Sequence, residues 1–254
     1  MNWNRFNDKA VIVTGAASGL GRATALAFAN EGARVALVDI NRAANLELLE
    51  TIEKLGGRAI ALTSDVASKD SVWKMVSETV AIFGGLDIAI NNAGIEQPPG
   101  RFLDLSEETF DRVMSINLRG VFLCMQAEIR EMLPRNRGAI VNVTSVTDEV
   151  AAAGNPSYVA SKHGALGLTR SLALEFATSG IRINAVSPGG MRTPMFEAVE
   201  KSQPELVAHG VALHPIGRIA HLSEVVNAIL FLASDEAGFI LGHSLKVDGG
   251  YTVA

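Results

Sequence analysis

The sequence predicts an α/β fold: a doubly wound parallel sheet of about seven strands, with helices on both faces. Short apolar runs alternate with longer helical patterns along all 254 residues, which is the order expected of strand–helix–strand units. Most of these runs are rich in Val, Ile and Leu without polar alternation, as in parallel strands covered on both faces. No Pro/Gly/Ser-rich linker or shift of composition divides the chain, so we expect a single domain over 1–254.

Each element follows from the same two patterns. The apolar runs too short for an ordinary helix predict strands at Ala10–Thr14, Val35–Asp39, Ala59–Thr63, Leu86–Asn91, Ala139–Thr144, Ile181–Val186 and Ser244–Val247. The segments between them predict helices at Gly21–Asn30, Arg42–Leu55, Lys69–Phe83, Glu107–Leu133, Ser157–Thr178 and Ser223–Ala233.

The composition narrows the class of protein. A net charge of -5 argues against nucleic acid or an anionic membrane as the main partner, because both require a basic face. No apolar run reaches the length of a membrane span, and Met1–Lys9 has no signal-peptide pattern. Cys124 is the only cysteine and the histidines are scattered, so we expect no disulfide and no metal site. These features favour the cytoplasm.

A glycine-rich turn follows the first expected strand directly. Its residues Gly15, Gly19 and Gly21 have the spacing G-x-x-x-G-x-G, and a helix follows. Glycines allow a tight turn and let a pyrophosphate approach free backbone N–H groups at the helix N-terminus. The context predicts a Rossmann-type dinucleotide site in which Ser18 and Leu20 also contact the cofactor.

Acidic residues end the next two strands. Asp39 lies twenty residues after Gly19, where a carboxylate reaches the hydroxyls of the adenine ribose in this fold. The following Ile40 is not a cation that could accept the 2′-phosphate of NADP, so NAD is favoured over NADP. Asp65 and Val66 follow the third strand and are expected at the adenine edge, although Asp65 could equally cap a helix.

Several further motifs occur in a recognisable order. They are Asn91-Asn92-Ala93-Gly94, Asn117, Ser145, Tyr158-x-x-x-Lys162 and Pro188-Gly189. With the glycine turn, they make the sequence resemble the short-chain dehydrogenase/reductase superfamily over almost its whole length. The resemblance implies a catalytic set of Asn117, Ser145, Tyr158 and Lys162, with Tyr158 and Lys162 also facing the cofactor.

The chemistry of this set can be rebuilt from the residues. Reducing a carbonyl requires a hydride on carbon and a proton on oxygen, and Tyr158 is the candidate acid/base. A free phenol has a pKa of about 10, so we expect a nearby cation to lower it by roughly 2–3 units. Lys162 lies one helical turn away on the same face. Ser145 is expected to hydrogen-bond the substrate oxygen, and the resemblance implies that Asn117 disrupts its helix and holds a water for Lys162.

The resemblance also assigns the remaining cofactor contacts and the assembly. Asn92, Ala93 and Gly94 are expected to line the adenosine side, and Pro188, Gly189, Met191 and Thr193 to lie near the nicotinamide. Gly190 departs from the bulkier residue often found there, so the path of that loop stays open. A variable substrate lid is expected at about 193–214, polar and irregular, and the chain is expected to form a homotetramer.

Two adjacent carboxylates, Asp148 and Glu149, occupy the loop between Ser145 and Tyr158, where many relatives have small residues. One interpretation is a solvated rim of the loop. The other is a carboxylate that faces the pocket and selects polar or cationic substrates.

Together these features predict a metal-independent, NAD-preferring oxidoreductase that interconverts a secondary alcohol and a ketone. The alternatives are a 3-oxoacyl thioester reductase, a sugar or cyclic-diol dehydrogenase, and, from another class, a catalytically silent dinucleotide-binding regulator or scaffold. The catalytically silent alternative is disfavoured because Ser145, Tyr158 and Lys162 are all present. The sequence leaves the small-molecule substrate, the stereospecificity and the preferred direction undefined.

Overall fold

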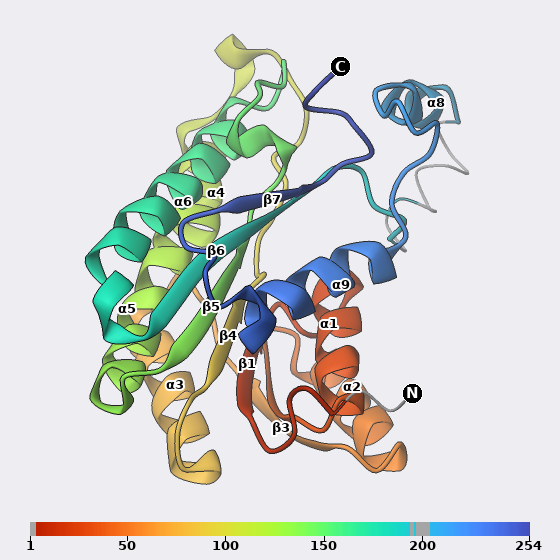
Figure 1. Cartoon of the computed structure of the whole chain (residues 1–254). Helices are drawn as coiled ribbons and strands as arrows, with labels where there is room; N and C mark the ends of the chain where they lie inside the picture. The colour runs from red at the N-terminus through yellow and green to blue at the C-terminus, as the bar shows by residue number, and fades with distance from the viewer. Residues whose placement is uncertain (1–3, 194–195, 197–203) are drawn as a thin grey trace.

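The computed structural model describes residues 4–193, 196 and 204–254. Over this part of the chain, seven parallel strands form one twisted sheet in the order β3-β2-β1-β4-β5-β6-β7 (Figure 1). The strands are β1 Ala10–Thr14, β2 Arg34–Asp39, β3 Arg58–Thr63, β4 Ile88–Asn91, β5 Gly138–Val143, β6 Ile181–Pro188 and β7 Ser244–Val247. The predicted fold class is confirmed, and the strand ends agree with expectation within two residues.

Helices cover both faces of the sheet, α1, α2 and α9 on one side and α3, α5 and α6 on the other (Figure 1). Alternate strand residues enter separate cores: Val11 and Val13 pack toward α1 and α9, and Ile12 between them packs toward α3 and α5. The helices are α1 Gly19–Asn30, α2 Arg42–Lys54, α3 Lys69–Phe83, α4 Glu107–Met114, α5 Gly120–Met132, α6 Pro156–Glu175, α8 Pro204–Ala212 and α9 Leu222–Ala233. None of those described is long and apolar enough to cross a membrane.

Local sequence signals set the ends of several helices. The hydroxyl of Ser106 accepts a hydrogen bond from the N–H of Thr109 at 3.1 Å and so begins α4, and Ser68 begins α3 in the same way. Gly84 ends α3 in the left-handed conformation with φ of 76°, which a residue with a Cβ rarely adopts. The caps at Ser68 and Ser106 thus end the loops that follow β3 and β4 at the carboxyl edge of the sheet.

Two segments differ from expectation. The single helix expected over Glu107–Leu133 is divided into α4, a π-helical turn at Ser115–Arg119 and α5, because Asn117 points inward and bonds another segment. The expected irregular lid contains the nine-residue helix α8, which was not predicted. The rest of that lid falls largely at 194–195 and 197–203, outside the described residues.

The strand order reverses between β1 and β4. The connections after these neighbouring strands run to opposite faces, which opens a crevice at the carboxyl edge of the sheet. The glycine turn follows β1 and the Asn92–Gly94 segment follows β4, so the topology brings both motifs to this crevice.

Candidate active site

The glycine turn and the segment after β4 are joined by hydrogen bonds across the crevice. The hydroxyl of Thr14 accepts the N–H groups of Asn92 and Ala93 at 3.0 and 3.1 Å, and the side-chain amide of Asn92 donates to the carbonyl of Thr14 at 2.9 Å. A Cβ at Gly21 would collide with the carbonyl oxygen of Gly15. The turn therefore closes only with glycine at position 21.

A cleft of about 370 Å³ opens beside this turn. Ser18 precedes α1 without a side-chain cap, so the first N–H groups of the helix stay available to a ligand. Of the predicted cofactor contacts, the cleft is lined by Gly15, Ser18, Gly19, Leu20, Asp39, Ile40, Asp65, Val66, Asn92, Ala93 and Gly94. These features fit a dinucleotide phosphate and its adenosine.

Asp39 is held in a fixed orientation at the end of β2. One carboxylate oxygen accepts the N–H of Ala17 at 2.9 Å and the other accepts the N–H of Asn41 at 2.8 Å. Each oxygen retains a lone pair toward the cleft. The adjacent Ile40 is 70% exposed, and Arg42 begins α2 on the surface.

The sequence reasoning missed Val38, Ser64, Ile95 and Ile116, which also line the cleft. Ile95 and Ile116 adjoin the predicted Gly94 and Asn117, so adjacency was the signal that could have found them. Val38 and Ser64 end apolar strands and carry no such signal.

Lys162 lies buried beneath the crevice, with Nζ donating to the carbonyl of Val143 at 3.0 Å. Burial lowers its pKa to about 8, while the charges of Asp148 and Glu96 act in the opposite direction. Nζ is 5.4 Å from the ring centroid of Tyr158. The predicted one-turn spacing therefore brings the cation to the phenol.

The pKa of Tyr158 differs from expectation. In the protein alone it is raised to about 12, first by burial of the phenol and then by the charge of Glu96, while a hydrogen bond with Ser145 lowers it. The expected depression below 10 is therefore wrong for the protein without ligands, because desolvation outweighs the lowering effect of Ser145. Tyr158 is held as a protonated acid.

Asn117 lies in the π-helical turn and is buried. Its side chain accepts the N–H of Ile95 and donates to the carbonyl of the same residue, both at 2.8 Å, and contacts Ser161 Oγ at 3.3 Å. A Cβ at Gly94 would lie 3.2 Å from Asn117 Oδ1 and 3.8 Å from Lys162 Nζ. The local helix disruption implied by the resemblance is present, and the water relay stays a prediction.

The segment after β6 approaches the glycine turn from the other side. A Cβ at Gly19 would lie 3.9 Å from the methyl carbon of Thr193. The N–H of Gly189 donates to Val247 at 3.1 Å, which extends the pairing with β7 past Pro188, and Met191 forms a bridge with Ala220. Thr193, one of the expected nicotinamide contacts, thus lies beside the glycine turn, and the role of the others stays a prediction.

The path of Gly190 is set by His214. The N–H of Gly190 donates to His214 Nε2 at 2.9 Å, and a Cβ at position 190 would lie 3.2 Å from the imidazole ring and closer still to Ile219. His214 Nδ1 lies 2.9 Å from the carbonyl of Gly210 in α8. The missing side chain at Gly190 makes room for this ring.

Both interpretations of the two carboxylates are wrong for Asp148. Its carboxylate is buried and accepts hydrogen bonds from Thr144, Ser187 and Ser244 at 2.7–3.2 Å, and from Lys246. It is neither a solvated rim nor free to face a substrate, because the three-residue turn after Ser145 directs it beneath β5, β6 and β7. Glu149 is 40% exposed and forms ion pairs with Arg170 and Lys246.

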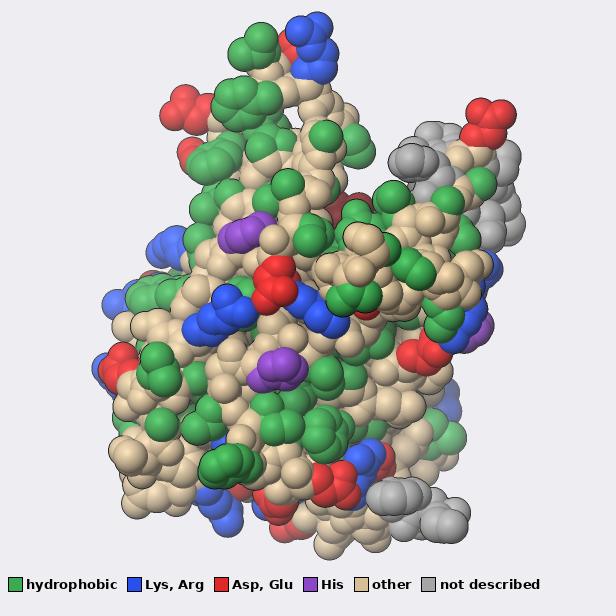
Figure 2. All heavy atoms as spheres, turned by 45° about the horizontal axis from the view of Figure 1, so that its top comes forward, with side chains coloured by type: hydrophobic (Ala, Val, Ile, Leu, Met, Phe, Trp, Pro, Cys, Tyr) green, Lys and Arg blue, Asp and Glu red, His purple; other side chains and the backbone are tan. Residues whose placement is uncertain are grey.

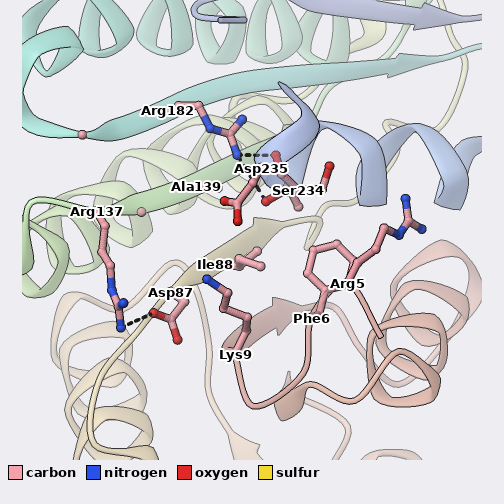
Figure 3. Close-up of a pocket in the computed structure, with 13 residues that line it drawn as sticks. Arg5, Phe6, Lys9, Asp87, Ile88, Arg137, Ala139, Arg182, Ser234 and Asp235 are labelled. Carbon is pink, nitrogen blue, oxygen red and sulfur yellow. Dashed lines mark hydrogen bonds and ion pairs between the residues drawn. The ribbon is translucent and has the colours of Figure 1, made fainter. Parts of the chain in front are cut away.

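A different hollow, of about 140 Å³, lies at the opposite, amino edge of the sheet (Figure 3). Several of its charged side chains have partners in the protein. Arg137 pairs with Asp87 at 3.1 Å, and Arg182 donates to carbonyls at the end of α9, including that of Ser234 at 2.8 Å. We therefore interpret these contacts as structural. The candidate chemistry lies at the carboxyl edge of the sheet.

The carboxyl edge is hollowed between two raised parts of the surface (Figure 2). Hydrophobic and uncharged side chains predominate on the described sides of this hollow, which suits a small organic substrate. No group of three or more side chains suited to a metal ion occurs in the described ranges.

Comparison with known proteins places this geometry in context. A family model described as "Enoyl-(Acyl carrier protein) reductase" matches residues 15–252. A cyclohexanol dehydrogenase of Acinetobacter sp. (strain SE19) is 41% identical over 98% of this chain and 97% of its own length. A cis-4-hydroxycyclohexanecarboxylate dehydrogenase of Sinomonas cyclohexanicum is 42% identical over 97% and 98%. The crystal structure of levodione reductase superposes with a TM-score of 0.90 at 36% identity, over 98% of this chain and 99% of that one.

Proposed function

Because the chain belongs to the short-chain dehydrogenase/reductase family, we propose that it is an NAD-preferring dehydrogenase that interconverts a secondary alcohol on a carbon ring and the corresponding ketone. The activity class of this family is the oxidation of alcohols with a nicotinamide cofactor. The ring is proposed because two similar relatives are named for cyclohexane alcohols.

One observation carries the proposal: Tyr158 lies close to both the hydroxyl of Ser145 and the ammonium of Lys162, and Lys162 lies beside Gly94, which lines the dinucleotide cleft. Ser145 is near enough to the phenol to lower its pKa, and Lys162 Nζ lies 5.4 Å from the centre of its ring. A carbonyl oxygen placed between the two hydroxyls would receive two hydrogen bonds where negative charge develops. The same arrangement has no use in a silent scaffold.

The protein's own groups provide the proton chemistry. Bound in the cleft, the nicotinamide dinucleotide supplies or accepts the hydride. Tyr158 donates its proton to the carbonyl oxygen during reduction and removes it from the alcohol during oxidation. The ammonium of Lys162 stabilises the phenolate left on Tyr158, and burial of the pair keeps this interaction strong. The nicotinamide end would be held by Pro188, Gly189, Met191 and Thr193. The adenine ribose would be held by Asp39.

The preference for NAD follows from the fixed carboxylate of Asp39. A carboxylate accepts the ribose hydroxyls, whereas a 2′-phosphate would bring about −1.5 to −2 charges close to it. Neither Ser18 nor Ile40 offers a compensating cation, and Arg42 lies on the surface at the start of α2.

We also propose a homotetramer in a reducing, cytoplasmic setting. An open apolar groove of about 810 Å³ runs between α4, the π-helical turn, α5 and α6, lined by Met114, Leu118, Phe122 and Leu168 among others. Gly164 and Gly167 flatten the α6 side and would allow a second helix to approach closely. The single cysteine, Cys124, is buried and free, as in proteins of reducing compartments.

The test is a spectrophotometric assay of the reduced nicotinamide with cyclohexanol and cyclohexanone. We expect turnover by the wild type and a loss of about 10²–10⁴-fold in Tyr158→Phe, which keeps the ring but cannot exchange a proton. Tyr251→Phe, the other tyrosine of the chain, is the matched control and should retain turnover. Activity of Tyr158→Phe near that of the wild type would refute the proposed mechanism.

A further inference from the structure

Glu96 stands between two residues that are anchored to the catalytic elements. On one side, both backbone groups of Ile95 bond the side chain of Asn117 at 2.8 Å. On the other side, the buried side chain of Gln97 accepts the N–H of Ser157 at 2.9 Å and donates to the carbonyl of Gly154 at 3.0 Å. The backbone at Glu96 is therefore fixed relative to Tyr158, the next residue after Ser157.

The side chain of Glu96 points away from the protein interior. Gln97 is only 2% exposed, whereas Glu96 is exposed to solvent. In the described parts of the chain, no hydrogen bond or ion pair engages its carboxylate. The two carboxylates of the loop between Ser145 and Tyr158 are occupied, Asp148 by three hydroxyls and Lys246, and Glu149 by Arg170 and Lys246. Glu96 thus remains able to bind a substrate group on this side of Tyr158.

The charge of Glu96 acts on both members of the reacting pair. It raises the pKa of Tyr158 and the pKa of Lys162, so the carboxylate lies within electrostatic reach of both side chains. A substrate whose reacting oxygen contacts Tyr158 therefore lies in the field of this charge. Among the described residues, no ion pair neutralises it.

We propose that Glu96 is a specificity-determining residue that accepts a hydrogen bond from a second hydroxyl of the substrate, so that the enzyme prefers cyclic diols to alcohols that carry a carboxylate. This inference rests on the proposed alcohol dehydrogenase activity. A carboxylate only accepts hydrogen bonds, so it favours a substrate with a hydrogen-bond donor and repels a negatively charged substrate. The role that the sequence left open for Asp148 and Glu149 thus falls to Glu96.

The test compares kcat/KM for three kinds of alcohol in the wild type and in Glu96→Gln. The probes are cyclohexanol, the cyclohexanediols (1,2 and 1,4) and 4-hydroxycyclohexanecarboxylate. Glutamine keeps the shape and removes the charge, and a bond to a neutral acceptor is weaker than one to a charged acceptor. We expect the ratio of the better diol to cyclohexanol to fall about fivefold, and that of the carboxylate to cyclohexanol to rise about threefold or more.

The pH profile provides a second readout, which a merely structural role would not change. Removing the charge of Glu96 lowers the pKa of both Tyr158 and Lys162. The rise of kcat for alcohol oxidation with increasing pH should therefore occur at lower pH. Glu149→Gln is the matched control, because Glu149 is an exposed carboxylate that already has ion-pair partners. It should change neither the kcat/KM ratios nor the pH profile of kcat.

The outcomes separate the two proposals. Unchanged ratios in an active Glu96→Gln overturn the role of Glu96 and leave the dehydrogenase activity standing. An equal shift in Glu149→Gln also overturns it, because the effect would then be a general one of charge. A wild type that turns over none of the alcohols overturns the proposed function, and this inference with it.

Discussion

The carboxylate of Asp148 lies 2.5 Å from the ammonium of Lys246, across 98 positions of the sequence. Three hydroxyls, from the end of β5, from β6 and from β7, complete the surroundings of this carboxylate. The turn that carries Ser145 is thereby tied to the last strands of the sheet.

We therefore expect Asp148→Ala to lower the free energy of unfolding by about 3 kcal/mol, because it leaves Lys246 and the hydroxyls without their acceptor. Urea denaturation measures the change. Glu149→Ala is the control, and its exposed ion pairs should contribute no more than about 1 kcal/mol. Similar unfolding midpoints for the two variants would contradict the structural role of Asp148.

The pH dependence of stability should carry the signature of Glu128. Its carboxyl is fully buried against Asn91, and burial raises its pKa to about 8. Its Oε1 and the Oδ1 of Asn91 have no hydrogen-bond partner among the described residues, so a proton on the carboxyl supplies a donor that a carboxylate lacks.

Between the unfolded pKa of about 4.3 and the folded value, the native state binds the extra proton. Stability should thus fall as pH rises through this window, by at most about 1.4 kcal/mol per pH unit, and level off above pH 8. Glu128→Gln carries no titrating proton, so its advantage over the wild type should grow from pH 5 to pH 8. Denaturation of both at several pH values measures this; a constant difference would show that Glu128 is ionised in the native state.

Cofactor choice should depend on Asp39. We expect at least a tenfold bias of kcat/KM toward NAD(H) over NADP(H), since hydrogen bonds to a charged acceptor are worth about 1.5–3 kcal/mol and a 2′-phosphate would be repelled. In Asp39→Ala the bias should shrink. Equal use of the two cofactors by the wild type would mean that Asp39 does not meet the ribose, or that Arg42 compensates for its charge.

The apolar groove beside α6 should be buried in the assembly. Phe122 is 42% exposed there, and Phe122→Glu should convert the expected tetramer to smaller species, because a buried unpaired charge is costly. Light scattering at micromolar concentration measures the mass. Leu55→Glu replaces a 65% exposed leucine after α2 and should leave the assembly intact. A wild-type monomer would refute the prediction.

Sequence patterns predicted the fold well because parallel strands and their helices follow from local periodicity. They also predicted that Lys162 would lie beside Tyr158, because residues four apart share one face of a helix. They failed where a side chain's role depends on distant partners. The burial of Asp148 depends on Ser187, Ser244 and Lys246, and the raised pKa of Tyr158 on desolvation, and neither leaves a local pattern.

The contact of His214 with Gly190 implies that these two positions evolve as a pair. A side chain added at 190 would press on the imidazole and on Ile219, and its backbone N–H would lose the ring nitrogen as acceptor if the ring moved away. Homologues with a bulkier residue at 190 should therefore have a smaller or differently placed residue at 214. A change at either position alone should therefore be less well tolerated than a paired change in the loop beside the glycine turn and at His214, two residues after α8.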